Sequence, residues 1–429
     1  MFLRSITLEH VRSIEHLELN FGDYPETRKW TLILGQNGCG KSTILRSIAL
    51  LTAGSDALPE LLRNPEDWVR NGHSECRLSG VIETTEGETR EISLTIGRDS
   101  SVSSILMLNR DSLEKLDSAL KHSNRNYFTA GYGVSRRFQS GASFSQGKWF
   151  SNPRSQSIAT LFSPDATLQS VDAWAAQLHY AKGDSVLNLL RQVFDQLLPG
   201  VSFREIDKTQ SRVLFDTADG VIPLDRLSDG YQNVAAWCGD LVNTLITVFQ
   251  NYDEPMHARG VLLVDEIDLH LHPVWQRQLR DYLSLQLPNF QIIATTHSAL
   301  TAHQCGINEL HCLARPSVDG PPVLRAYPGE PRKLLLHQLL LDPMFGLGTM
   351  DSLDVSRKKT QLRELRAKAN RNPEESVKLS ALRDELSDVP SWTGAPLIPP
   401  SVGKALRALA VDPPKLKKGS VQKTARRKK

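Results

Sequence analysis

The chain has 429 residues, of which 40% are hydrophobic and 7% aromatic, so it can bury a substantial core and form two or three domains or lobes. No apolar run approaches the roughly 18 residues that a membrane span needs, and charges interrupt the first residues too often for a signal peptide. We therefore expect a cytoplasmic protein without membrane contact. The five cysteines are scattered and form no CxxC pair, which argues against a disulfide framework and against a zinc site and favours ordinary buried residues.

The positive charge is concentrated at the C-terminus. The net charge of +3 comes from 51 Lys and Arg against 48 Asp and Glu, and eight of the basic residues but no acid lie in Lys415–Lys429. The rest of the chain is therefore acidic. Such a basic block predicts a disordered arm. It either contacts the phosphates of a nucleic acid or is solvated without a specific partner.

Alternating and periodic apolar residues predict the elements along the chain. Residues 2–11 and 16–21 are expected to form two edge strands of a hairpin. A short buried strand at 31–35 is expected before a glycine-rich loop, followed by a helix at 39–54 that Gly54 ends. A further strand pair around an acidic turn is expected over 76–98. Helices are expected over 168–198, 227–249, 273–287 and most of 333–390, and strands over 211–217, 220–227, 260–266 and 290–298. We expect an α/β fold.

The glycine-rich loop reads GQNGCGKS over residues 35–42. Its glycines let the backbone fold so tightly that its N–H groups face phosphate oxygens at the start of a helix. Lys41 would then supply positive charge to the β- and γ-phosphates of ATP, and the Ser42 hydroxyl would bind Mg²⁺. The residues expected to contact the nucleotide are Gly35, Asn37, Gly38, Cys39, Gly40, Lys41, Ser42 and Thr43.

Two further strand ends carry polar residues that suit phosphate chemistry. The apolar run 261–264 ends in Asp265 and Glu266, which would bind Mg²⁺ and accept a proton from the attacking water, respectively. A second buried strand ends in Thr295, Thr296 and His297, and the imidazole of His297 would lie near the γ-phosphate. An acidic pair after a strand is common and a histidine there is often structural, so it is their order behind the glycine-rich loop that favours a catalytic set.

A segment between these motifs indicates the class of NTPase. The stretch LSDGYQ at residues 227–232 resembles the LSGGQ signature of ABC-type ATPases. The resemblance implies an ABC-type ATPase head, built on a mixed β-sheet with a P-loop core, together with a helical signature lobe and a C-terminal helical region. It also implies a homodimer or higher oligomer, in which Ser228 and Gly230 of one subunit contact the γ-phosphate held by the other.

Other stretches narrow the resemblance. The N-terminal 21 residues are similar to the opening of RecF-like and SMC-like heads, which places Arg12 and Ser13 near the nucleotide. LLVDEIDLHLHP resembles OLD-like and AAA15-type ATPases of bacterial defence systems, and GYGVSRR with LSDGYQN resembles the Septu ATPase subunit PtuA and retron-associated relatives. This implies an ATP-hydrolysing subunit of an anti-phage complex that controls a separate HNH-type, PtuB-like nuclease. The alternative is a RecF-like DNA repair or replication ATPase that clamps DNA.

The resemblance covers residues 1–345 and suggests the domain division. The ATPase domain would have a core of residues 1–130 and 205–330 and a helical lobe of about 131–204, followed by a helical region at 346–398 and the basic tail at 399–429. We expect the nuclease to dock on residues 333–390, unless that region simply packs onto the core.

Three departures from the family pattern are visible, at the family's glutamine, within the signature and in the loop that contains two histidines. Tyr132 and Gly133 replace a glutamine, and the following Arg136 or Arg137 either senses phosphate or is an ordinary surface residue. Asp229 replaces a glycine of the signature. His270 and His272 either report across a dimer interface, cap a helix or bind a metal.

Overall fold

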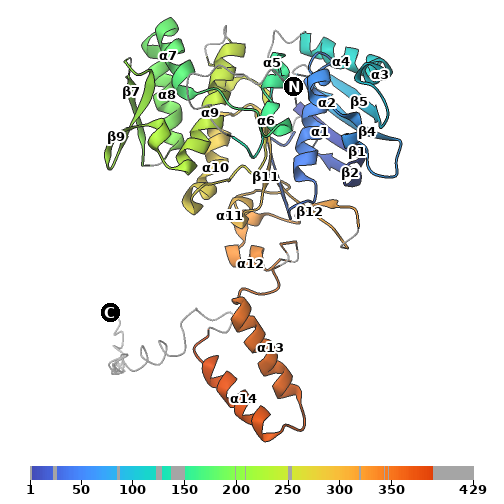
Figure 1. The fold of residues 1–429 in the computed structure, drawn as a ribbon, viewed down its shortest axis with the longest axis vertical. Helices are drawn as coiled ribbons and strands as arrows, with labels where there is room; N and C mark the ends of the chain where they lie inside the picture. Colours follow the sequence, from blue (N-terminus) through green and yellow to red (C-terminus); the bar gives the residue numbers. More distant parts are fainter. Residues whose placement is uncertain are drawn as a thin grey trace, which may run out of the picture. The chain divides into compact units, whose positions relative to one another are not determined.

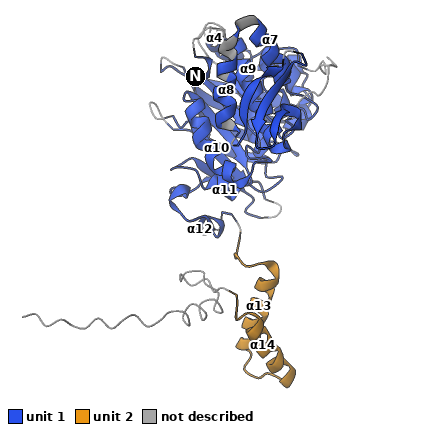
Figure 2. Cartoon of the chain, turned by 90° about the vertical axis from the view of Figure 1, so that its left-hand side faces the viewer, with its two compact units in different colours: residues 1–346 blue, residues 347–429 orange. Residues whose placement is uncertain are grey.

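The structure is a computed structural model that describes residues 2–22, 27–84, 87–121, 128–136, 150–198, 200–207, 209–249, 254–317, 320–342, 344–345 and 347–389. It divides into two compact units, residues 1–346 and 347–429 (Figure 2). Residues 390–429, and with them the predicted basic tail, lie outside the described residues.

A six-stranded mixed sheet forms the centre of the first unit (Figure 1). Its strands, in spatial order, are β13 (Val323–Ala326), β12 (Leu310–Ala314), β3 (Trp30–Gly35), β11 (Phe290–Thr296), β10 (Gly260–Val264) and β6 (Phe128–Tyr132). All pairs are parallel except β12 with β13. Parallel strands have their carboxyl ends at one edge of a sheet, so the residues that follow β3, β11, β10 and β6 lie together there.

Alternate residues of the central strands enter two separate cores. Val261, Leu263 and Ile293 pack with one set of helices and strands, whereas Leu262 and Ile292 pack with the other. Both faces of the sheet are thus covered, which explains why these strands are apolar without alternation. Figure 1 shows α9 (Asp229–Val248) and α10 (Pro273–Gln286) on one side of the sheet and α1 (Lys41–Ala53) on the other.

The second sheet is antiparallel and packs beyond α1. Its spatial order is β2 (Ile14–Asn20), β1 (Phe2–Val11), β4 (Glu75–Glu83) and β5 (Thr89–Gly97). The predicted hairpins β1–β2 and β4–β5 are confirmed. The prediction that β1 is an edge strand is wrong, because β1 also pairs with β4 over Phe2–Glu9. Alternation in a sequence reports one buried face, but it does not report how many neighbours a strand has.

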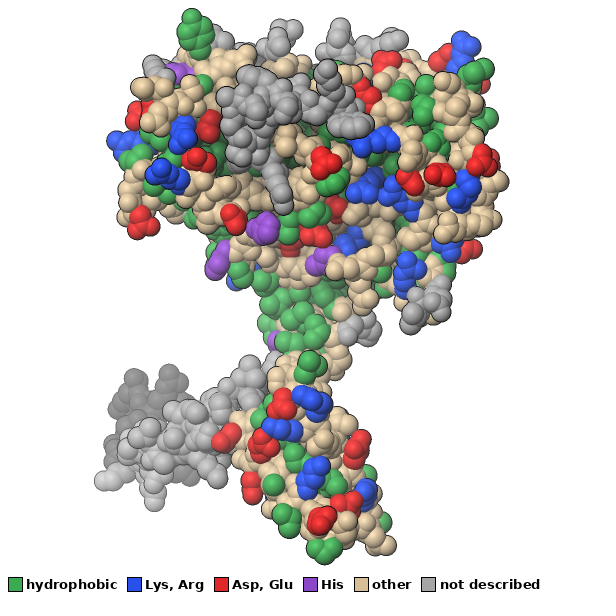
Figure 3. Space-filling model, viewed as in Figure 1, with side chains coloured by type: hydrophobic (Ala, Val, Ile, Leu, Met, Phe, Trp, Pro, Cys, Tyr) green, Lys and Arg blue, Asp and Glu red, His purple; other side chains and the backbone are tan. Residues whose placement is uncertain are grey.

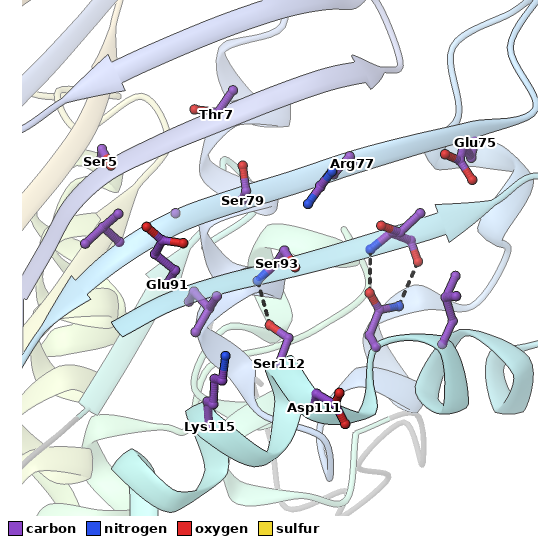
Figure 4. A pocket seen from close by; sticks show the side chains of 16 residues that line it. Ser5, Thr7, Glu75, Arg77, Ser79, Glu91, Ser93, Asp111, Ser112 and Lys115 are labelled. Atoms are coloured by element: carbon purple, nitrogen blue, oxygen red, sulfur yellow. Dashed lines mark hydrogen bonds between the residues drawn. The ribbon is translucent and has the colours of Figure 1, made fainter. Parts of the chain in front are cut away.

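The outer face of this antiparallel sheet carries an open hollow of about 750 Å³ (Figure 4). Hydroxyl, acidic and basic side chains line it, among them Ser79, Arg77, Glu91 and Lys115. A mixed polar surface is ordinary for an antiparallel sheet with one face in water. At the edge of the sheet, the Ser112 hydroxyl of α4 (Arg110–Lys121) accepts a hydrogen bond from the Ser93 amide at 2.6 Å, so α4 covers part of the free edge of β5.

The remaining elements of the first unit surround these sheets. The helices are α2 (Leu58–Leu62), α3 (Val102–Leu108), α4 (Arg110–Lys121), α5 (Pro153–Gln156), α6 (Ala159–Phe162), α7 (Val171–Lys182), α8 (Asp184–Leu197), α11 (Ala299–Ala302) and α12 (Leu336–Leu340). A third sheet has the order β7 (Ser202–Asp207), β8 (Arg212–Thr217) and β9 (Gly220–Pro223), and four 3₁₀ turns span Pro65–Trp68, Leu224–Arg226, Pro255–His257 and Pro331–Lys333.

The second unit contains two helices within its described residues, α13 (Leu353–Ala367) and α14 (Pro373–Glu385). The prediction of a mostly helical 333–390 is therefore only partly correct, because the helices there are separate pieces. Asn372 caps α14 and forms a capping box with Glu375, and the ring of Pro373 suits a first helical turn but not a helix interior.

The surface and the cysteines agree with the composition. Basic, acidic and histidine side chains are interspersed on the face shown in Figure 3. All five cysteines are buried and unpaired, as predicted. Within the described ranges, no helix combines the length and the apolar character that crossing a bilayer requires.

Candidate active site

The glycine-rich loop connects β3 to α1 and depends on two kinds of glycine. Gly38 and Gly40 have φ values of 75° and 101°, a region that other residues rarely enter. Gly35 is needed for space, because a Cβ there would lie 2.4 Å from the carbonyl oxygen of Leu313 on the neighbouring strand. Gly54, at φ 83°, ends α1 as predicted. The loop is thus a compact turn at the N-terminus of a buried helix, which is the geometry that favours anions.

Lys41 points back across this loop. Its ammonium donates hydrogen bonds to the carbonyl oxygens of Gly35 at 2.9 Å and Gln36 at 3.1 Å, and it lies 2.8 Å from Nε2 of His297. The side chain is only 6% exposed. Burial lowers the pKa of Lys41, whereas the nearby carboxylates of Asp265 and Glu266 oppose that shift. The loop lysine, the acidic pair and the histidine therefore share one electrostatic environment.

The acidic pair follows β10 at the same edge of the sheet. Asp265 is 3% exposed, and its Oδ1 accepts a hydrogen bond from the hydroxyl of Thr295 at 2.5 Å. The same hydroxyl accepts a hydrogen bond from the Glu266 amide at 2.8 Å. Glu266 has a positive φ of 47°, and its carboxylate lies 3.8 Å from Nε2 of His297. The turn thus buries the first carboxylate and leaves the second within reach of the histidine.

His297 lies between the lysine and Glu266. Burial lowers its pKa first, and the Lys41 ammonium lowers it further against the pull of the acidic residues. A neutral imidazole can accept a hydrogen bond at Nε2 only when its proton is on Nδ1. The contact with the lysine therefore selects the neutral form of His297 with an unprotonated Nε2.

Comparison with known proteins agrees with this geometry. A family model described as "AAA domain, putative AbiEii toxin, Type IV TA system" matches residues 31–302, which include the loop, the acidic pair and the histidine. The chain belongs to this AAA-domain family. The predicted mixed α/β fold with its P-loop core and the resemblance to PtuA-like ATPases are thereby confirmed.

Individual relatives of this AAA-domain protein cover different shares of it. The Septu protein PtuA of Bacillus mycoides is 27% identical over 90% of this chain and 50% of that protein. The Retron Ec83 probable ATPase of Escherichia coli is 30% identical over 29% of this chain and 23% of that protein. A solved SMC head bound to the C-winged helix domain of ScpA shares 14% identity over 76% of this chain and 98% of that chain, with a TM-score of 0.47. The chain thus spans about half the length of the PtuA relative.

Hydroxyl groups behind the AAA-domain motifs hold the acidic loop in place, and the sequence motifs did not reveal them. Besides Thr295, the hydroxyls of Thr296 and Thr301 donate to Oδ2 of Asp268 at 2.7 and 2.9 Å. Asp268 is only 7% exposed. The TT dipeptide before His297 was a visible signal, since a strand that ends in hydroxyl residues at a phosphate site can orient neighbouring carboxylates.

Arg12 and Ser13 lie in the turn between β1 and β2, and their side chains contact different parts of the structure. The Ser13 hydroxyl lies 3.1 Å from the position that a Cβ on Gly40 would occupy, so Ser13 borders the loop. The Arg12 guanidinium instead lies 4.5 Å from the centre of the Trp68 ring and donates to the carbonyl oxygen of Asp67 at 3.0 Å. The structure therefore brings Ser13 to the glycine-rich loop and directs the Arg12 side chain to the 3₁₀ turn.

The signature segment begins α9. Ser228 is exposed, and its side chain makes no capping hydrogen bond with the helix. Gly230 is tightly packed, because a Cβ there would lie 2.7 Å from the carbonyl oxygen of His270. Asp229 is also exposed. The segment thus presents a hydroxyl, a carboxylate and a helix N-terminus outward while resting on the histidine loop.

Of the two loop histidines, His272 caps a helix, which is one of the three roles expected for this pair. Its Nδ1 accepts a hydrogen bond from the Val274 amide at 3.3 Å at the start of α10. His270 has a positive φ of 64°. Within the described part of the chain, no group of three or more His, Cys, Asp or Glu residues could hold a metal ion, so a site built on these histidines gains no support.

The chemistry of Ser42 and Asp265 suits Mg²⁺. Both offer oxygen ligands, which Mg²⁺ prefers, and both follow strands that end at the same edge of the sheet. Asp265 accepts a hydrogen bond from the Thr295 hydroxyl, and Ser42 lies in the first turn of α1 directly after the glycine-rich loop.

Proposed function

We propose that the chain binds ATP with Mg²⁺ in the glycine-rich loop and hydrolyses it. The observation that supports this most is that Lys41, Glu266 and His297 converge, with His297 Nε2 at 2.8 and 3.8 Å from the other two side chains. Lys41 stabilises the negative charge of the β- and γ-phosphates, and Glu266 accepts the proton of the attacking water. His297, neutral at pH 7, orients that water or a γ-phosphate oxygen. Ser42 and Asp265 would hold Mg²⁺, whose chemistry would be to supply positive charge for the leaving group.

The active unit in this proposal is a dimer of two copies. The exposed Ser228 hydroxyl and the adjoining N-terminus of α9 are free to contact a phosphate, and Gly230 brings the backbone close. A helix N-terminus and a hydroxyl both favour an anion. Each copy would hold ATP on its own loop and receive Ser228 and Gly230 from the other copy.

The biological role in this proposal is defence against phage. Similarity to PtuA over 90% of the chain and to a retron ATPase supports an ATP-dependent subunit that controls a separate HNH-type nuclease. The described residues of the second unit offer exposed apolar side chains for that partner, among them Leu347, Met350 and Leu353. A nucleic acid contact through Lys415–Lys429 remains part of the proposal and concerns residues outside the described ranges.

The test of hydrolysis compares the purified wild type with Lys41→Ala and Glu266→Gln. The lysine variant should lose affinity for a fluorescent ATP analogue, whereas the glutamine variant should bind it and hydrolyse ATP about 10²- to 10⁴-fold more slowly. Light scattering should show the Glu266→Gln variant as a dimer with ATP and as a smaller species without it. A glutamine variant that stays monomeric at saturating ATP would exclude the shared site.

The test of the partner is affinity purification of the tagged chain from its native host during phage infection. A nuclease that co-purifies with wild type in an ATP-dependent manner supports the defence role. Recovery of DNA and replication proteins alone would favour the RecF-like alternative, in which the chain clamps DNA directly. In that case, removal of residues 415–429 should weaken DNA binding and reduce its dependence on salt.

A further inference from the structure

Arg136 lies in the loop that follows β6, beside the acidic turn. Its side chain is 3% exposed, so the hypothesis of an ordinary surface arginine is wrong. Its hydrogen bonds within the described residues go to main-chain carbonyl groups and not toward the glycine-rich loop. Arg137 lies outside the described residues. Arg136 is therefore placed to act on the protein backbone.

The guanidinium of Arg136 holds the acidic pair by its backbone. Nη2 donates to the carbonyl oxygen of Asp265 and, at 2.6 Å, to that of Glu266, while Nε donates to the carbonyl oxygen of Gly133 at 2.7 Å. One rigid, planar group thus fixes two successive peptide units of the acidic turn relative to the end of β6. Residues 136 and 265 are 129 positions apart in the sequence, so only the fold brings them together.

The acidic turn needs such support because of its backbone conformation. Glu266 has a φ of 47°, a left-handed conformation that is strained for a residue other than glycine. The amides of the pair are held as well, that of Asp265 by the Tyr132 carbonyl oxygen and that of Glu266 by the Thr295 hydroxyl, both at 2.8 Å. Arg136 completes the set by binding the two carbonyl groups.

Burying the charged side chain of Arg136 in this arrangement costs free energy. Burial lowers the pKa of Arg136 to about 10, even though Asp265, Asp268 and Glu266 lie near enough to oppose the shift. Nη1 has no hydrogen-bond partner within the described part of the chain. The guanidinium carbon also lies 5.9 Å from the ring centre of Trp237 on α9. A buried, incompletely paired cation opposes folding, which is typical of residues kept for a site.

We propose that Arg136 is a positioning residue for ATP hydrolysis: by holding the carbonyl groups of Asp265 and Glu266, it sets the direction in which the Glu266 carboxylate meets the attacking water. The inference rests on the proposed ATPase activity and assigns no contact between Arg136 and the nucleotide.

The test uses Arg136→Lys and Arg136→Ala, because a lysine keeps the charge but cannot hold two carbonyl groups with a planar fork. Both variants should lower kcat by about 30- to 100-fold, the scale expected when a reacting group is misplaced by about 1 Å. The KM for ATP and the affinity for a fluorescent ATP analogue should stay within about threefold of wild type. In a Glu266→Gln background, Arg136→Lys should lower kcat no further, since Arg136 acts through that carboxylate.

A matched control is Arg280→Ala. Arg280 is also a partly buried arginine with a bidentate contact, to Glu309 at 2.9 and 2.6 Å, but Glu309 precedes β12 at the opposite edge of the sheet from the acidic turn. Its loss should lower thermal stability and leave kcat unchanged. If Arg280→Ala lowers kcat as much as Arg136→Lys does, the effect is general destabilisation and the inference is overturned.

Hydrogen exchange without nucleotide gives a readout independent of activity. The amides of residues 264–270 should exchange at least about tenfold faster in Arg136→Lys than in wild type, because opening of the turn is then less costly. An inactive wild type would reject the proposed function. Equal exchange rates in wild type and Arg136→Lys would show that Arg136 does not hold the acidic turn. An active wild type with unchanged kcat in both Arg136 variants would overturn this inference alone.

Discussion

The ammonium of Lys41 lies 2.8 Å from Nε2 of His297, and the same nitrogen lies 3.8 Å from a carboxylate oxygen of Glu266. The imidazole thus stands between the group that would bind phosphate and the group that would activate water. Because Nε2 faces an ammonium, protonation of the imidazole would place two like charges in contact. The proposed catalytic set of Lys41, Glu266 and His297 is therefore sensitive to acid at His297.

Stability should reflect this sensitivity. Burial and the Lys41 ammonium lower the pKa of His297 in the folded protein below its ordinary value of 6.5. Between the lowered pKa of the folded state and the pKa of 6.5 in the unfolded state, the unfolded chain therefore binds more protons than the folded one. The contribution is present above pH 6.5 and is lost as the pH falls toward the folded pKa. Chemical denaturation from pH 8 to 5 should show a shallower loss of stability in His297→Gln than in wild type. Parallel curves would contradict the shift.

Thr295 should matter through its hydroxyl group. The side chain is fully buried, donates to Asp265 and accepts from the Glu266 amide. Thr295→Val keeps the shape but leaves both partners unsatisfied, which should lower the free energy of unfolding by about 1–3 kcal/mol and reduce kcat. Urea unfolding and steady-state kinetics measure the two effects. Thr295→Ser retains the hydroxyl and serves as the control, so equal losses in both variants would show that the missing hydrogen bonds are not the cause.

The parts of this site that were predictable from sequence are local. Glycines before Lys41, an apolar run before Asp265 and another before His297 each carry their signal within a few residues, because tight turns and buried strands constrain neighbouring positions. The supports are not local. Thr295 reaches Asp265 across 30 positions and Arg136 across 129, and no short pattern encodes such pairs. The extra pairing of β1 was missed for the same reason.

The pair of Tyr132 and Asp240 should add a second pH dependence of opposite sign. Burial raises the pKa of Asp240 to about 6, despite the hydrogen bond that it accepts from the Tyr132 hydroxyl at 3.0 Å. The folded state then binds the proton more tightly than the unfolded chain, whose pKa is near 3.8, so stability is lost as the pH rises through 6. A shift of this size corresponds to up to about 3 kcal/mol.

Asp240→Asn should remove this loss. The variant keeps a hydrogen-bond acceptor for Tyr132 but carries no charge, so at pH 8 it should be more stable than wild type and at pH 4 about equal to it. Thermal unfolding at both values measures the difference. Asp219→Asn changes an exposed carboxylate as a control and should leave the pH dependence as it is in wild type. A variant that is less stable than wild type at pH 8 would mean that the ionised carboxylate stabilises the fold.

Gly230 tests whether the signature helix must rest on the histidine loop. A methyl group there would lie 2.7 Å from the carbonyl oxygen of His270. This oxygen belongs to the backbone of a residue with a positive φ, so it cannot easily yield and the start of α9 must move away. Overpacking of this kind costs about 1–3 kcal/mol.

If Ser228 closes over the nucleotide of a second copy, Gly230→Ala should bind ATP like the wild type but dimerise at least about tenfold more weakly in a Glu266→Gln background. Gly348→Ala, which adds a methyl group in open space, is the control and should dimerise normally. Dimers that form equally well in both variants, measured by sedimentation with saturating ATP, would show that this end of α9 does not lie at the shared site.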